Sequence, residues 1–169
     1  MRIETERLVI TELTIEMAQA IHENSLDDVT RRFVPDEVFE TPEIAREAVA
    51  FLMSRYDDPE GPWVYAVTRK TDGRCIGYVQ MVLLEDGTWE IGYQIGEQFR
   101  GSGFAAEAVR AFLPVMAERL GISEIRGICL RENAASRRVL EKCGFEIVYV
   151  GPGQYQGNRR EIVRSIWKA

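Results

Sequence analysis

The sequence predicts a mixed α/β domain, in which helices cover a sheet that contains both antiparallel and parallel strands. Two Asp-Gly pairs separate three runs of alternating apolar residues between Trp63 and Ile95, a pattern typical of an antiparallel meander. A long helical pattern then leads to another strand-like run at 124–130. Because a helix crosses between them, that run and the one at 88–95 should be parallel.

The length and composition are those of one globular domain. The chain has 169 residues, of which 46% are hydrophobic and 28% are charged, enough to form a single core. We therefore expect one domain over 1–169. No apolar run is long enough to span a bilayer, and Met1-Arg2-Ile3-Glu4 leads directly into structured sequence rather than a signal peptide. The prediction is a soluble cytoplasmic protein with no membrane partner.

Charge and cysteine usage exclude several classes of function. The net charge of −6 argues against nucleic acid as a partner and mildly favours a cationic substrate. Cys75, Cys129 and Cys143 lie far apart among apolar neighbours, which favours free core thiols over a disulfide or a metal site. His22, the single histidine, is expected in a surface helix, so we predict no metal centre. The oligomeric state is left open, with a homodimer as one option.

The N-terminal third begins with a strand and continues into helices. Alternation of apolar residues over 6–13 predicts the strand, and a helix begins at Thr14. The stretch 25–40 shows no long period and is expected to form a short helix and a loop. Thr41 and Pro42 then supply a capping hydroxyl and a first-turn proline for a longer helix.

The C-terminal half alternates helices and strands. The helix that follows the meander should end at Gly121 and should be kinked at Pro114, which removes one backbone hydrogen bond. The remaining expected elements are a strand at 124–130, a helix at 133–143, and strands at 145–150 and 161–167 bounded by breakers at 151–153 and 156–158.

A glycine turn joins the best strand of the chain to its longest helix. Within the segment Gln98–Ala105, Gly101 and Gly103 permit positive φ and carry no Cβ. Consecutive N–H groups can therefore close on an anion, and the N-terminus of the following helix adds partial positive charge. This turn predicts a cradle for a diphosphate.

The same glycines leave two alternatives open. Gly101-x-Gly103-x-x-Ala106 also fits the fingerprint of an oxidoreductase that binds NAD or FAD. Against that interpretation, an antiparallel meander precedes the turn, and Glu124 begins a strand rather than ending one, so no acidic residue is placed to bind a ribose. The second alternative is a non-catalytic acyl-CoA-binding module that kept the cradle and lost turnover.

Four segments in order resemble one known family, the GCN5-related N-acetyltransferases (GNAT), and within it the group typified by ribosomal-protein N-terminal acetyltransferases. The resemblance is closest between Trp63 and Phe145. The segments are Glu90-Ile91-Gly92-Tyr93, Gln98-x-x-Gly101-x-Gly103, Phe104-Ala105-Ala106-Glu107-Ala108-Val109 and Glu132-Asn133-x-x-Ser136-x-x-Val139-Leu140-Glu141-Lys142-Cys143-Gly144-Phe145.

The resemblance implies a mostly antiparallel sheet whose two parallel strands splay apart and admit acetyl-CoA. It further implies transfer of the acetyl group to a primary amine, on a protein N-terminus or a small molecule, by direct attack through a tetrahedral intermediate. An N–H near Ile95 would stabilise the oxyanion, and Arg100, Arg137, Arg138 or Lys142 would meet the 3′-phosphate. The expected cofactor-binding residues are Tyr93, Gln94, Ile95, Gln98, Arg100, Gly101, Ser102, Gly103, Phe104, Ala105, Asn133, Ser136 and Arg137.

Proton transfer is the chemical problem of such a reaction, because an amine with a pKa near ~10.4 is almost fully protonated at neutral pH. Glu90 shares a strand face with Gly92 and Gln94, whose side chains leave room for an acceptor. The hypothesis is that Glu90 accepts the proton through water. The equally open alternative is that Glu90 is exposed at a strand edge, or has its hydrogen bonds supplied within the core, and takes no part in the reaction.

The departing thiolate needs a hydrogen-bond donor. The resemblance places Ser136 near the sulfur, and Tyr155 is the competing donor because its hydroxyl is more acidic. Asn133 would bind the pantetheine arm, yet its place three residues before Ser136 also makes it a good N-cap. Both roles of Asn133 stay open.

Overall fold

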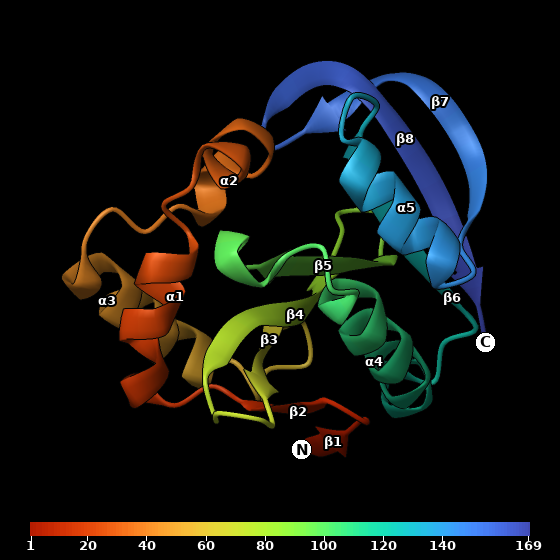
Figure 1. The fold of residues 1–169 in the computed structure, drawn as a ribbon. Helices are drawn as coiled ribbons and strands as arrows, with labels where there is room; N and C mark the ends of the chain where they lie inside the picture. The colour runs from red at the N-terminus through yellow and green to blue at the C-terminus, as the bar shows by residue number, and fades with distance from the viewer.

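One eight-stranded sheet forms the centre of the protein, with strand order β1-β2-β3-β4-β5-β6-β8-β7 (Figure 1). The computed structural model describes residues 1–169. The strands are β1 (Arg2–Glu4), β2 (Leu8–Glu12), β3 (Trp63–Arg69), β4 (Cys75–Leu83), β5 (Trp89–Ile95), β6 (Glu124–Leu130), β7 (Glu146–Tyr155) and β8 (Asn158–Lys168). The helices are α1 (Ala18–Asn24), α2 (Asp28–Phe33), α3 (Pro42–Met53), α4 (Phe104–Leu120) and α5 (Ala134–Lys142), with short 3₁₀ turns η1 (Ile15–Met17), η2 (Pro35–Glu37) and η3 (Glu97–Phe99).

All pairs of neighbouring strands are antiparallel except β5 and β6. These two strands are parallel, because α4 crosses between them, and they pair only where Glu90 lies beside Arg126. Beyond that point they separate, whereas β4 and β5 stay paired from Leu83–Trp89 to Gly77–Ile95. The predicted mixed sheet with a splayed parallel pair is confirmed.

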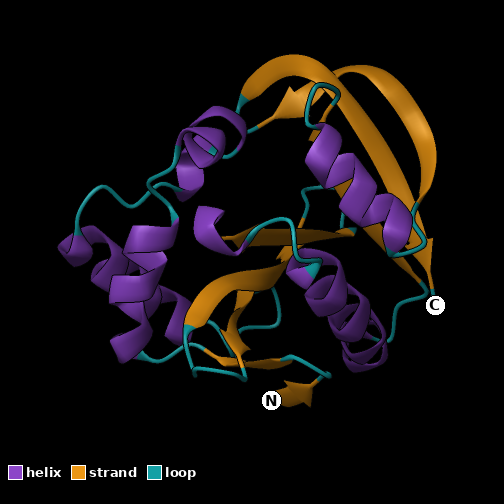
Figure 2. Cartoon of the chain, in the orientation of Figure 1, coloured by secondary structure: helices purple, strands orange, loops and turns teal.

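Helices cover the sheet on both faces (Figure 2). The larger core lies between the sheet and α4, where Phe112, Leu113 and Met116 are fully buried. A second, smaller core joins α1 and α3 to the opposite face through residues such as Val49 and Val64. No helix combines the length and the apolar character that crossing a bilayer would require.

Several local signals act as the sequence predicts. Thr41 caps α3 by accepting a hydrogen bond from the Ile44 N–H at 3.2 Å, and α4 ends at Gly121 with φ of 64°. The helix continues through Pro114 to Leu120.

The three cysteines of the protein are all free, with Cys129 and Cys143 buried and Cys75 half-buried.

The C-terminal hairpin is longer than the sequence predicts: the predicted break at 151–153 is wrong, and the break predicted at 156–158 is confirmed as a turn at Gln156 and Gly157 only. β7 runs through 151–153, and β8 already begins at Asn158. Pro152 pairs with Glu161 and is tolerated because β7 is the edge strand, where a missing N–H can face away from the ladder. β1 was missed altogether, because three residues are too few to show a period.

The buried face of α4 makes a direct stability prediction. Phe112→Ala should lower the free energy of unfolding by about 3–5 kcal/mol, because Phe112 is fully buried and its removal leaves a cavity. Phe51→Ala is the matched control, since Phe51 is 57% exposed and should cost at most about 1 kcal/mol. Urea denaturation of both variants measures the difference. An equal loss of unfolding free energy in the two variants would contradict the assignment of Phe112 to the core.

Candidate active site

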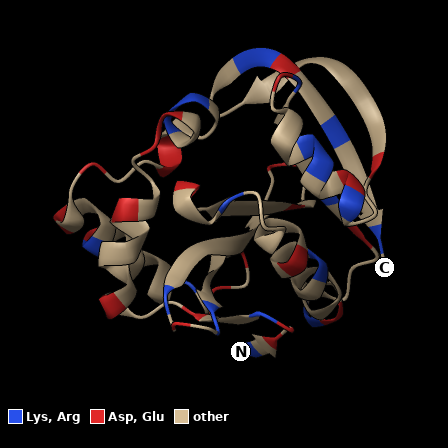
Figure 3. Cartoon of the chain, in the orientation of Figure 1, with Lys and Arg blue, Asp and Glu red and all other residues tan.

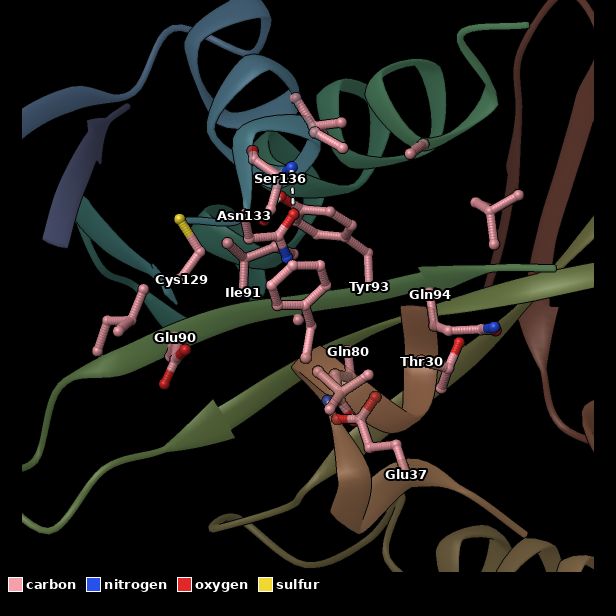
Figure 4. A pocket seen from close by; sticks show the side chains of 18 of the residues that line it. Thr30, Glu37, Gln80, Glu90, Ile91, Tyr93, Gln94, Cys129, Asn133 and Ser136 are labelled. Carbon is pink, nitrogen blue, oxygen red and sulfur yellow. Dashed lines mark hydrogen bonds between the residues drawn. The ribbon is translucent and has the colours of Figure 1, made fainter. Parts of the chain in front are cut away.

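A cavity of about 1000 Å³ opens where β5 and β6 separate. α2, α5 and the β7–β8 hairpin surround it, and Figure 4 shows the side chains that line it. Of the residues that the sequence singles out, the cavity brings together Glu90, Tyr93, Gln94, Ile95, Arg100, Gly101, Gly103, Phe104, Ala105, Asn133, Ser136 and Tyr155. Gln98, Ser102 and Arg137 do not line it.

The edge of β5 that faces the gap carries unpaired backbone groups. At the two ends of the β4–β5 ladder, Leu84 N–H donates to Thr88 and Gly96 N–H donates to Ile76. The backbone N–H and C=O groups of successive residues point to opposite sides of a strand. The even-numbered residues of β5 therefore form hydrogen bonds with β4, and the odd-numbered residues face the other way. The N–H groups of Tyr93 and Ile95 therefore point toward the gap, where β6 no longer pairs with them.

The glycine turn presents a row of free amides. From Gly101 to Ala106, no N–H finds an acceptor within the protein. Gly101 and Gly103 have φ of 81° and 82°, a backbone conformation that favours glycine. Arg100 does not contribute its amide to this row, because the Arg100 N–H donates to the Glu97 carbonyl at 3.2 Å.

The side chain of Arg100 is engaged within the protein rather than free to meet a phosphate. Its guanidinium forms a bidentate pair with Asp27 at 2.8 and 3.0 Å, and its Nε donates to the Ile95 carbonyl at 2.7 Å. Burial raises the pKa of Asp27, but hydrogen bonds from Arg100 and Thr30 outweigh it and lower that pKa to about 2. Arg100 thus anchors the end of β5 to the start of α2.

Arg7, which sequence reasoning missed, fixes the orientation of the cradle. Its Nη1 donates to the Ser102 carbonyl at 2.9 Å, and its Nε donates to Glu107 at 2.7 Å. In a trans peptide the C=O and N–H point in opposite directions. Because Arg7 holds the Ser102 carbonyl, the N–H of Gly103 in the same peptide unit faces the opposite side.

On one face of β5, the hydroxyl of Tyr93 meets the hydroxyl of Ser136 from α5. Tyr93 OH lies 2.7 Å from Ser136 Oγ, as the dashed line in Figure 4 marks. Asn133 Oδ1 accepts a hydrogen bond from the Ser136 N–H at 3.1 Å, so the predicted N-cap is confirmed. Burial raises the pKa of Tyr93, which keeps its hydroxyl protonated.

The other face of β5 carries Glu90, with Glu37 and Gln80 on the same side (Figure 4). Glu90 accepts no hydrogen bond from the chain; burial and then the negative charge of Glu37 raise its pKa to about 7, against the opposing effect of Arg126. Sequence reasoning missed Glu37, because it lies in the irregular stretch between α2 and α3. No periodicity marks it.

The remaining candidates serve partly in packing. Tyr155 OH donates to the Phe33 carbonyl at 2.8 Å. Gln94 is buried and donates to the backbone carbonyl of Asn24, while Gln98 lies 3.3 Å from the Asn24 side chain. Arg137 is exposed.

Comparisons with known proteins agree with this geometry. A family model described as an acetyltransferase (GNAT) domain matches residues 7–146. The uncharacterized N-acetyltransferase YnaD of Bacillus subtilis is 29% identical over 146 residues, which cover 86% of this chain and 82% of YnaD. The uncharacterized N-acetyltransferase YoaA of the same organism is 29% identical over 147 residues, with coverage of 85% and 82%.

Solved structures share the fold at low identity. A GNAT-family acetyltransferase from Bacillus anthracis superimposes with a TM-score of 0.84 at 23% identity, over 99% of this chain and 98% of its own. RimL, a ribosomal-protein alpha-N-acetyltransferase solved in complex with coenzyme A, gives a TM-score of 0.83 at 18% identity, with coverage of 99% and 98%.

The chain therefore belongs to the GNAT acetyltransferase family, and its class of activity is N-acetyltransferase. The alternative of a nicotinamide or flavin oxidoreductase receives no support. The sheet of this protein has a single parallel pair of strands, whereas such enzymes need a doubly wound parallel sheet. The alternative of a non-catalytic module receives none from the family match either.

The raised pKa of Glu90 predicts how stability depends on pH. Because the folded state keeps this proton up to about pH 7, compared with 4.5 for an ordinary glutamate, the wild type should lose stability as pH rises through that window. The loss is at most about 3 kcal/mol at about 1.4 kcal/mol per pKa unit. Glu90→Gln has no such titration, so its Tm relative to wild type should rise between pH 5 and pH 8.

Thermal melts across this pH range measure the effect. Glu118→Gln is the control, because Glu118 is exposed on α4, and its Tm difference from wild type should stay constant. A constant difference for Glu90→Gln as well would show that the Glu90 carboxyl is not protonated by burial.

Proposed function

We propose that the protein transfers an acetyl group from acetyl-CoA to a primary amine, on a peptide N-terminus or a small molecule. The observation that carries this proposal is the run of free amides from Gly101 to Ala106 beside the splayed β5 edge. A diphosphate needs several convergent donors and a close backbone approach, and this turn supplies both without a lysine. The residues present therefore fit the cofactor.

Different parts of the chain would hold different parts of acetyl-CoA. The free amides would bind the diphosphate, with the N-terminus of α4 adding partial positive charge. Lys and Arg gather on α5 (Figure 3), and Arg138 and Lys142 line the cavity there, so they are suited to the 3′-phosphate. The Tyr93 and Ile95 N–H groups at the β5 edge would donate to carbonyl oxygens of the pantetheine arm and the thioester.

The bound cofactor would supply an activated acetyl thioester, and the chain would supply the proton acceptor. Glu90 lies free in the cavity with a pKa of about 7, so a substantial fraction is ionised at neutral pH. It is also a stronger base than an ordinary carboxylate. In the proposal Glu90 removes the proton of the acceptor ammonium, directly or through one water.

The hydroxyl pair would stabilise the departing thiolate. Tyr93 OH lies 2.7 Å from Ser136 Oγ, where either hydroxyl can donate, and 3.1 Å from the Ser136 carbonyl, to which it can also donate. In the proposal the single Tyr93 proton goes to one of these oxygens, and the proton of Ser136 points toward the sulfur. Tyr155 is the competing donor from the sequence prediction, but its own proton is used by the Phe33 carbonyl. We therefore assign the contact with the thiolate to Ser136. Tyr155 instead joins the β7–β8 hairpin to α2.

A peptide acceptor is supported by the structural neighbours described as ribosomal-protein acetyltransferases, RimL and a protein from Salmonella typhimurium that modifies the N-terminal serine of a ribosomal protein. Because these share only the fold, the small-molecule alternative stays part of the proposal. The cytoplasmic location and the homodimer remain predictions.

Thiol release in the presence of acetyl-CoA and a panel of amines tests the proposal. Coenzyme A should raise the Tm and NAD should leave it unchanged, and free thiol should appear only when an amine is present. Stabilisation by coenzyme A with no turnover on any amine would instead support a non-catalytic acyl-CoA-binding module.

The cradle makes a specific prediction for binding. Gly101→Ala should weaken coenzyme A binding by about tenfold or more, because an alanine at φ of 81° is strained by about 1–2 kcal/mol and the turn must shift. Gly73→Ala is the matched control, since Gly73 also has positive φ (68°) and open space around it but lies outside the cavity.

Calorimetric titration and thermal melts of both variants separate the two effects. Both should lose similar stability, and only Gly101→Ala should lose affinity. Equal affinity in the two variants would remove the turn from the binding site.

The assignment of Glu90 predicts a pH profile. In the wild type, kcat/KM for a fixed amine should rise through about pH 7 as Glu90 ionises. Glu90→Gln should lower kcat/KM by about 100-fold and abolish that inflection, whereas Glu118→Gln should retain the wild-type profile. An unchanged profile in Glu90→Gln would assign the proton transfer to another group.

A further inference from the structure

A second carboxylate lies in the cavity without a cationic partner. Glu37, at the end of η2, accepts hydrogen bonds from Tyr78 OH and from Gln80 Nε2, the latter at 2.9 Å. Both donors are neutral, and Glu37 forms no salt bridge. Burial raises its pKa, although the two hydrogen bonds act against that shift. A half-buried carboxylate whose hydrogen-bond donors are all neutral gains from a positive charge beside it.

The sheet is shaped to hold this carboxylate in place. Gly92 lies directly opposite Gln80 in the β4–β5 ladder, and a Cβ on Gly92 would lie 2.5 Å from Gln80 Nε2. The missing side chain of Gly92 therefore leaves the space in which the Gln80 amide lies and reaches Glu37. Gly92 and Glu90 are two residues apart on the same strand face, a step of about 6.6 Å.

Two of the arginines that line the cavity are already paired with carboxylates. Arg126 pairs with Asp86 at 2.6 Å, and Arg100 pairs with Asp27 at 2.8 Å. Arg164, which also lines the cavity, lies on β8 beyond β6 and is placed over the ring of Tyr149. On the side of the cavity formed by β4 and β5, Glu37 therefore has no cation of the chain beside it. Arg126 lies next to Glu90 in the sheet but is bound to Asp86.

We propose that the acceptor carries a second positive charge, bound by Glu37, while Glu90 receives the proton from the amine that is acetylated. The inference rests on the function proposed above and narrows it to acceptors with two cationic groups a short aliphatic distance apart. An acceptor with a single amine would cover the half-buried Glu37 without neutralising it, and sites that leave such a polar group unpaired reject incomplete substrates.

Two pairs of probes with equal chain lengths test this preference. Putrescine and butylamine, and likewise cadaverine and pentylamine, differ in the second ammonium. The wild type should show a kcat/KM at least about tenfold higher for each diamine than for its monoamine. Glu37→Gln should remove that preference by raising KM for the diamines, with kcat changed by less than about threefold.

Two further variants separate recognition from folding. Asp36→Asn removes the same charge from the neighbouring exposed position outside the cavity, and it should keep the wild-type preference. Gly92→Ala should displace the Gln80 side chain and lose the preference as Glu37→Gln does. Coenzyme A should stabilise all variants equally, because none contacts the cradle.

The outcomes distinguish this inference from the proposed function. Equal kcat/KM for diamine and monoamine in the wild type would overturn the inference while leaving the acetyltransferase assignment intact. An equal loss for both amines in Glu37→Gln would also overturn it, because Glu37 would then have a purely structural role. No turnover with any amine would overturn both.

Discussion

The limited pairing of β5 with β6 is the constraint on which the site depends. The two strands pair at Glu90 and Arg126 and then separate, so the far end of β5 keeps N–H groups with no partner strand. Unpaired strand edges recruit other chains or ligands unless they are covered. Here the edge opens into a cavity rather than to the surface, which reserves its donors for a ligand.

Two arginines keep this opening in shape. Arg100 binds the last carbonyl of β5 and Asp27 at the start of α2, while Arg7 binds the Ser102 carbonyl and Glu107 in the first turn of α4. Both satisfy carbonyls that would otherwise compete for incoming donors. In the Ser102–Gly103 peptide unit, the Gly103 N–H on the other side is thereby left for an anion, whereas the Gly96 N–H next to the Ile95 carbonyl donates to Ile76.

The alternation of side chains along β5 divides the chemistry between two faces. Tyr93 reaches Ser136 on the α5 side, and Glu90 lies on the side of Glu37 (Figure 4). A thioester that enters between the strands would meet a hydroxyl pair on one face and a carboxylate on the other. Such an arrangement keeps the proton acceptor away from the leaving thiolate, so each can have the environment that its charge requires.

The sequence by itself determined the local features: the Asp-Gly hairpins, the crossover that makes β5 and β6 parallel, the caps at Thr41 and Asn133 and the glycine cradle. Tertiary structure decided the partners of Arg7 and Arg100, which lie 95 and 73 residues away, as well as the place of Glu37 in the cavity. Turn chemistry and periodicity act over a few residues, so they are visible in sequence. Contacts between distant segments, and the burial that raises the pKa of Glu90, exist only once the sheet has brought those segments together.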